Sequence, residues 1–156
     1  MKYKILIGIL LVFLLLSFVN AKDISELTDE ELENVKYFTN DTLVEVNGFN
    51  FNIPKGFGSL KDYDINTTLN NVTTYCTFYV NDDGDVLMLS TISGDNVDLD
   101  LDSYDTHNDS EKKTIKGHEG LQFEEEDLEY FNYIDNDTLI ILQAPDDDYF
   151  DVMIRD

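Results

Sequence analysis

The chain has few groups that could cross-link it and few positive charges. Cys76 is its sole cysteine, so no disulfide can form within the chain and stability must come from a hydrophobic core. Only 10 lysine and arginine residues stand against 33 aspartate and glutamate residues. This balance disfavours nucleic acid and anionic membrane surfaces as partners. The P-loop, the G-x-G-x-x-G loop and the G-x-S-x-G elbow are also absent, so no catalytic motif indicates an enzyme.

The first 21 residues have the composition of an export signal. A basic start is followed by an uncharged apolar run over residues 5–19. Val19 and Ala21 then stand at the −3 and −1 positions of a cleavage site, which completes the pattern of a secretory signal peptide. The run is short for a transmembrane helix, which needs roughly 20 residues, but a retained N-terminal anchor stays as the alternative. Either way, the sequence predicts an extracytoplasmic domain, secreted or attached to the membrane by residues 1–21.

Alternating apolar residues flank turn sequences at several points after residue 40. Asn47-Gly48 separates residues 42–46 from residues 49–53, which is the strongest short-range signal for a β-hairpin. Further hairpins are expected over residues 72–92, 112–125 and 128–143, whereas residues 58–71 are expected to form a loop. On its strand, Cys76 is expected to be a buried small hydrophobe rather than a reactive thiol.

Helices are expected near both ends of this β-rich region. Thr28 and Glu31 form a capping box. Pro145 and the aspartates after it predict a helix over residues 149–154, with a strand as the alternative. The elements together predict an α+β fold, an antiparallel β-sheet built from hairpins and covered by helices near each end. The predicted order is a signal or anchor helix over residues 1–21, a spacer with a short helix over 22–40, and an acidic globular domain over 41–156.

Two blocks of sequence resemble a family. Residues 46–57 read VNGFNFNIPKGF, an N-G-x-x-F-x-I-P-x-G-F block, and residues 113–120 read KTIKGHEG. The combination is similar to small uncharacterised secreted proteins of methanogenic archaea, and the order of elements resembles the PsbP/Mog1-type α/β/α sandwich. The resemblance implies an exported α+β domain over roughly residues 42–154. It implies no functional site, because turns and core aromatics make up these motifs.

Five N-x-S/T sequons make glycosylation a candidate modification. This is more than the about two that the content of Asn, Ser and Thr predicts by chance. Because such short segments also serve as turns, turn chemistry is the competing interpretation. The predicted acceptors are Asn40, Asn66, Asn71, Asn108 and Asn136.

One acidic stretch partly matches a calcium-binding loop. Asp98, Asp100 and Asp102 copy the first three ligand positions of an EF-hand loop. Ser103 then stands where that loop needs glycine, and apolar residues alternate with the aspartates as they would in an edge strand. His107 and His118 have no partner at zinc-site spacing and are expected to be solvated surface residues.

These features favour a binding module over an enzyme. The leading hypothesis is a non-enzymatic domain that binds a protein or cell-envelope partner and needs no resident cofactor. One alternative is an extracytoplasmic enzyme with a carboxylate-lined cleft, and another is a surface domain stabilised by Ca²⁺. The sequence indicates no catalytic residues and no oligomeric state.

Overall fold

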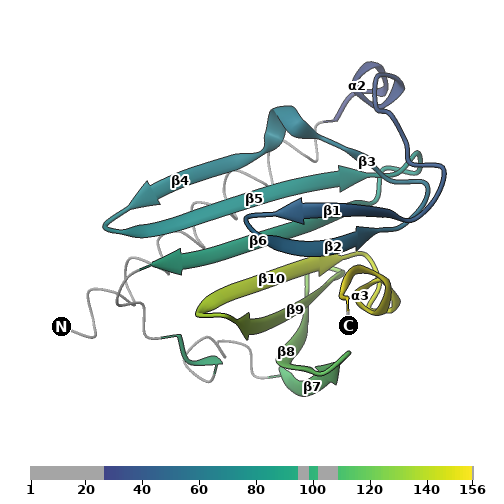
Figure 1. The fold of residues 1–156 in the computed structure, drawn as a ribbon. Helices are drawn as coiled ribbons and strands as arrows, with labels where there is room; N and C mark the ends of the chain where they lie inside the picture. The colour runs from purple at the N-terminus through teal and green to yellow at the C-terminus, as the bar shows by residue number, and fades with distance from the viewer. Residues whose placement is uncertain (1–26, 95–98, 102–108, 156) are drawn as a thin grey trace. The chain divides into compact units, whose positions relative to one another are not determined.

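The computed structural model describes residues 27–94, 99–101 and 109–155 (Figure 1). The chain divides into two units, Met1–Val35 and Lys36–Asp156. The predicted signal or anchor segment, residues 1–21, lies outside the described residues. Within the described ranges, no helix is both long and apolar enough to cross a membrane.

The described part of the first unit holds one short helix, α2 (Asp29–Glu33). Its capping box is confirmed, because the Thr28 hydroxyl accepts a hydrogen bond from the Glu31 N–H at 3.3 Å, and the Glu31 carboxylate accepts one from the Thr28 N–H at 2.8 Å. These two bonds satisfy backbone donors that the first helical turn would otherwise leave unpaired. No residue of α2 is buried.

The second unit is an antiparallel β structure. Its large sheet has the strand order β3-β5-β6-β10-β9-β8-β7, with β4 also paired to β5, and a separate hairpin consists of β1 and β2. The strands are β1 (Thr42–Val46), β2 (Phe49–Ile53), β3 (Gly58–Ser59), β4 (Ile65–Leu69), β5 (Val72–Val80), β6 (Val86–Gly94), β7 (Glu111–Ile115), β8 (His118–Glu125), β9 (Leu128–Asp135) and β10 (Thr138–Ala144). A 3₁₀ turn, η1 (Lys61–Tyr63), precedes β4, and helix α3 (Asp148–Met153) follows β10.

Two-residue turns connect most neighbouring strands. Both residues of these turns have positive φ, the conformation that a type I′ hairpin turn requires. The turns are Asn47-Gly48, Asn70-Asn71, Lys116-Gly117, Glu126-Asp127 and Asn136-Asp137. The hairpins expected around Asn47-Gly48, over residues 72–92 and before α3 are confirmed. The hairpin expected over residues 112–125 is also confirmed, with its turn at Lys116-Gly117.

The main core lies on one face of the large sheet, between that face and two smaller elements. Phe51 and Ile53 of β2 pack there together with Phe150 and Met153 of α3, and all four side chains are at most 1% exposed. The β1–β2 hairpin and α3 lie on the same side of the large sheet (Figure 1). A hydrogen bond also fastens the hairpin turn, because Asn47 Nδ2 donates to the buried Thr91 hydroxyl of β6 at 3.1 Å.

The opposite face of the large sheet is buried as well. Cys76 is 0% exposed there, as predicted, and burial holds the pKa of its thiol well above the ordinary value. Phe78 and Ile92 point to the same face and are at most 1% exposed. The central strands β5, β6, β9 and β10 are therefore apolar on both sides, as covered strands are.

The predicted fold class is wrong. Strands account for 54% and helices for 13% of the described residues, and both helices are short. α3 has only six residues, and a hairpin takes the place that a covering helix was expected to have. The described chain is therefore a mostly antiparallel β-sheet fold rather than an α+β fold covered by helices. The prediction of a loop over residues 58–71 is also wrong, because this segment contains β3 and β4.

Candidate functional site

A pocket of about 400 Å³ lies where β2, the adjoining ends of β8 and β9, and the chain's C-terminal segment meet. β2 contributes two phenylalanines and an asparagine, β8 a histidine, β9 a tyrosine and an aspartate, and the segment after α3 an arginine. The lining residues are Phe49, Asn50, Phe51, His118, Tyr133, Asp135 and Arg155. The pocket thus combines aromatic surface with both signs of charge, as ligand sites often do.

A chain of aromatic rings connects the pocket to the core. The rings of Phe150 and Phe131 lie 6.0 Å apart between centroids, and those of Phe131 and Tyr133 lie 5.5 Å apart. The imidazole of His118 completes the series, 4.7 Å from the Tyr133 ring at an interplanar angle of 47°. Since Phe131 and Phe150 are fully buried, the rings that reach the pocket rest on fixed neighbours.

Arg155 is the charged group that distinguishes the pocket. It is the sole arginine in a chain with 33 acidic residues, and its side chain is exposed. The structure records no ion pair between Arg155 and any residue of the ranges it describes. A guanidinium presents five N–H donors in a planar fork that suits a carboxylate or a phosphate. Arg155 is therefore placed to bind an anionic group at the pocket.

Asp135 supplies the opposite charge. It stands two residues after Tyr133 on β9, so the two side chains share a face of the sheet. Burial raises the pKa of Tyr133 well above its ordinary value. The negative charge of Asp135 raises this pKa further, because it disfavours the formation of a negatively charged tyrosinate nearby. Tyr133 consequently remains a neutral hydroxyl at physiological pH, beside one negative and one positive group.

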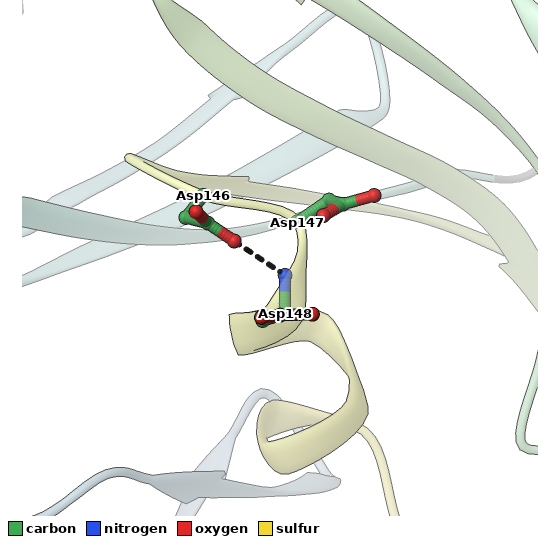
Figure 2. A group of neighbouring side chains, drawn as sticks. All are labelled: Asp146, Asp147 and Asp148. Atoms are coloured by element: carbon green, nitrogen blue, oxygen red, sulfur yellow. Dashed lines mark hydrogen bonds between the residues drawn. The ribbon is translucent and has the colours of Figure 1, made fainter.

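A second polar cluster has the composition of a metal site, but two of its three carboxylates have structural partners. Asp146, Asp147 and Asp148 are exposed and place carboxylate oxygens within 4.8 Å of one another (Figure 2). The N–H of Asp148, the first residue of α3, donates to Asp146 Oδ1 at 2.9 Å. Asp147 Oδ2 accepts hydrogen bonds from Gln122 Nε2 at 3.0 Å and from Lys113 Nζ at 3.4 Å. The cluster thus begins a helix and connects it to β7 and β8.

The predicted calcium ligands are only partly within the described ranges. Asp100 is described and exposed, whereas Asp98, Asp102 and the neighbouring His107 lie outside the described residues. The calcium site therefore stays a prediction. His118, expected to be a solvated surface residue, instead begins β8 and is half-buried against Tyr133.

Four of the five predicted glycosylation acceptors are exposed, namely Asn40, Asn66, Asn71 and Asn136, and the fifth, Asn108, lies outside the described residues. Asn71 and Asn136 adopt positive φ in hairpin turns, so their turn role explains the choice of residue without a glycan. The sequon threonines of Asn66 and Asn71 hydrogen-bond to each other, since the hydroxyl oxygens of Thr68 and Thr73 lie 3.0 Å apart. Glycosylation stays a prediction.

Sequence reasoning did not bring the pocket residues together. They come from β2, β8, β9 and the C-terminal segment, which lie far apart in the sequence. The one available signal was composition, because a single arginine in a strongly acidic chain is unusual.

Comparisons with known proteins give one family. A model described as a domain of unknown function (DUF4367) matches residues 49–149. No curated protein and no solved structure matches the chain. The matched range contains all of the pocket-lining residues except Arg155, which follows it. Because the match spans well over half of the 156 residues, the chain belongs to the DUF4367 family.

Proposed function

We propose that the protein is an extracytoplasmic binding module whose pocket takes a zwitterionic ligand of the amino-acid or short-peptide type. The observation that carries the proposal is that the sole arginine of the chain lies in the pocket without an ion-pair partner among the described residues. In this proposal Arg155 binds the carboxylate of the ligand, Asp135 binds its ammonium group, and the rings of Phe49 and Tyr133 contact its side chain.

The charge of the protein favours a zwitterion over a simple anion. A net charge of −23 repels anions at long range, and this repulsion grows with the charge of the ligand. A zwitterion has no net charge, so it reaches the pocket without that penalty. Once bound, it meets a positive and a negative group that complement its own two charges.

The alternative of an enzyme with a carboxylate-lined cleft has less support. That hypothesis requires a cleft lined by carboxylates, and Asp135 is the only carboxylate among the pocket-lining residues that the structure describes. The enzyme hypothesis therefore has no observation of its own in its favour.

The extracytoplasmic location in the proposal rests on the sequence of residues 1–21. Mass spectrometry of the intact native protein tests it. A chain beginning at Lys22 supports secretion, and a chain that begins at Met1 in a membrane fraction supports anchoring. A chain beginning at Met1 in the soluble cytoplasmic fraction would contradict export.

Titration of the ¹⁵N-labelled full chain with L-phenylalanine, followed by NMR, tests the ligand. We expect saturable shifts of the amide signals of residues 49–51, 118 and 133–135, with weaker binding of phenylacetate and phenethylamine, each of which lacks one charged group. Arg155→Gln should weaken binding by about ten-fold, because a charge-assisted hydrogen bond contributes about 1.5–3 kcal/mol. Asp135→Asn should have a similar effect.

Lys55→Gln is the matched control, since Lys55 is exposed and does not line the pocket. It removes the same charge and should change the dissociation constant by less than about two-fold. If no saturable shift occurs at about 10 mM ligand, a concentration far above the dissociation constant of a specific site, or if Lys55→Gln weakens binding as much as Arg155→Gln does, the proposed ligand class is wrong.

A further inference from the structure

The strand β4 forms an edge of the large sheet with unusual composition. Among the strands of the described residues it pairs only with β5, and its residues 66–69 are exposed. Residues 65–80 contain no charged side chain, although charged residues make up 28% of the chain. By contrast, β7 at the opposite edge has three charged residues among its five. Charged residues on an edge strand prevent pairing with other chains, and β4 lacks this protection.

The hairpin geometry determines which backbone groups of β4 face outward. The two-residue turn at Asn70-Asn71 makes Leu69 and Val72 a hydrogen-bonded pair, and such pairs alternate along an antiparallel ladder. The N–H and C=O groups of Asn66 and Thr68 therefore point away from β5. The 3.0 Å contact between the hydroxyl oxygens of Thr68 and Thr73 agrees with this register, because side chains are closest in the non-hydrogen-bonded pairs.

We propose that β4 pairs with β4 of a second copy of this chain, antiparallel and about a two-fold axis at Thr67. In this register Asn66 lies opposite Thr68 of the second copy, and Thr68 lies opposite its Asn66. All four outward-facing residues then exchange backbone hydrogen bonds with one another. Leu69, whose side chain is 46% exposed, lies opposite Ile65 of the second copy on the same face of the joined sheet. The symmetric register thus satisfies the outward polar groups and covers the exposed leucine.

The symmetric register is what makes a second copy the occupant, and charge explains why that copy binds at this edge. Two copies that each carry a charge of −23 repel each other wherever acidic surfaces meet. This repulsion is lowest when the two copies meet at the uncharged edge. Because the remaining repulsion is between like charges, salt should screen it and strengthen the dimer. An interface held by ion pairs would weaken with salt instead. A glycan on Asn66 would block the edge, so we expect pairing only between chains in which Asn66 is unmodified.

Sedimentation equilibrium of the unglycosylated full chain tests the proposal through the charge at Thr67. Thr67→Lys places two lysines opposite each other only in the symmetric register, and like charges directly opposite are destabilising. We expect its dimer dissociation constant to rise at least about five-fold, and that of Thr67→Glu to rise likewise. An equimolar mixture of the two variants should restore pairing, because lysine then lies opposite glutamate.

Thr114→Lys is the matched control, since Thr114 is an exposed threonine of β7 at the opposite edge. The dimer dissociation constant of this variant should stay within about two-fold of that of the unmodified chain. Circular dichroism melts check that each variant is folded. The proposal is wrong if the unmodified chain is monomeric at about 1 mM protein in 0.5 M salt, a concentration far above the dissociation constant of a specific dimer. It is also wrong if Thr67→Lys and Thr114→Lys raise the dimer dissociation constant equally, or if mixing Thr67→Lys with Thr67→Glu does not restore dimer formation.

Discussion

The ring of Phe131 occupies the space that a side chain on Gly120 would need. A Cβ atom added to Gly120 would lie 2.6 Å from ring carbons of Phe131 and 2.5 Å from the backbone oxygen of Asn132. Gly120 is in β8 and Phe131 in the neighbouring β9. Since the backbone oxygen is held in the sheet, the glycine cannot be replaced without moving either the strand or the ring that supports Tyr133.

Gly120→Ala should therefore destabilise the fold by about 2 kcal/mol, the usual scale of overpacking in a core. In an unconstrained strand the same change would reduce the entropy of the unfolded chain and stabilise the protein, so the sign of the effect tests the contact. Urea unfolding measures it. Glu119→Ala, at the exposed neighbouring position, is the control and should change the free energy of unfolding by less than about 0.5 kcal/mol.

Asn47→Gly should loosen the β1–β2 hairpin from the sheet. Glycine keeps the positive φ of the turn, but it removes the 3.1 Å hydrogen bond to Thr91 Oγ1 and leaves that buried hydroxyl without this donor. Asn136→Gly makes the same change in a turn where the side chain has no such bond to a distant strand. We expect Asn47→Gly to cost about 1 kcal/mol more than Asn136→Gly, measured by chemical unfolding. Equal costs would contradict the role of the Asn47–Thr91 bond.

Asp147 should contribute to stability only while it is ionised. The hydrogen bond from Gln122 lowers the pKa of its carboxyl, and Lys113 lowers it further. A carboxyl whose folded pKa lies below its unfolded value stabilises the fold above about pH 4 and loses this effect as the pH falls through the folded pKa. The side chain is 46% exposed, so the contribution should stay below about 1 kcal/mol.

Urea unfolding of the Asp147→Asn variant at pH 7 and pH 3 measures this contribution. The variant should be less stable than the unmodified chain at pH 7, and the difference should shrink at pH 3. A difference that is the same at both pH values would show that the charge of Asp147 is not involved. Asp151→Asn, at an exposed position of α3, is the control and should stay within about 0.5 kcal/mol at pH 7.

Buried tyrosines should make the protein sensitive to alkali. Burial raises the pKa of Tyr79 to about 12, and burial with nearby glutamates does the same for Tyr130. A group whose folded pKa is raised stabilises the fold below its unfolded value, near 10, and this contribution is lost as the pH rises through 12. Ultraviolet titration should show tyrosines that ionise well above pH 10 in the folded chain but near pH 10 in urea. Tyr130→Phe keeps the stacking on Phe123 at 5.0 Å and should remove one late step; an unchanged titration would contradict the assignment.

Turn residues between alternating apolar segments made the hairpins predictable, and a strand without that alternation was missed. Asn47-Gly48 and Asn136-Asp137 interrupt alternating segments, so their strands could be identified from the sequence. β4 could not, because residues 66–69 are all exposed and leave no apolar periodicity. The covering helices were wrongly expected because a wide sheet needs its core face covered, whereas here Phe51 and Ile53 of a hairpin cover it.

The pocket was beyond the reach of sequence reasoning for a different reason. His118 stands in a local sequence typical of a surface turn, and Tyr133 in one typical of a core strand. Their ring contact depends on the pairing of β8 with β9, in which Tyr133 lies opposite Gly120. Arg155 joins them only because α3 turns the chain end back toward the sheet. Local patterns identify residues but not which strand ends meet.

The order of strands also has a kinetic consequence. β4 to β6 form one meander and β7 to β10 another, and each consists of hairpins whose contacts are close in sequence. The two meanders meet along the β6–β10 ladder, which pairs residues about 45–55 positions apart. Forming this ladder is the entropically costly step in folding, because the chain between β6 and β10 must close into a loop before the two strands can pair. Substitutions that weaken the β6–β10 ladder should therefore slow folding, whereas those in the outer hairpins should mainly hasten unfolding.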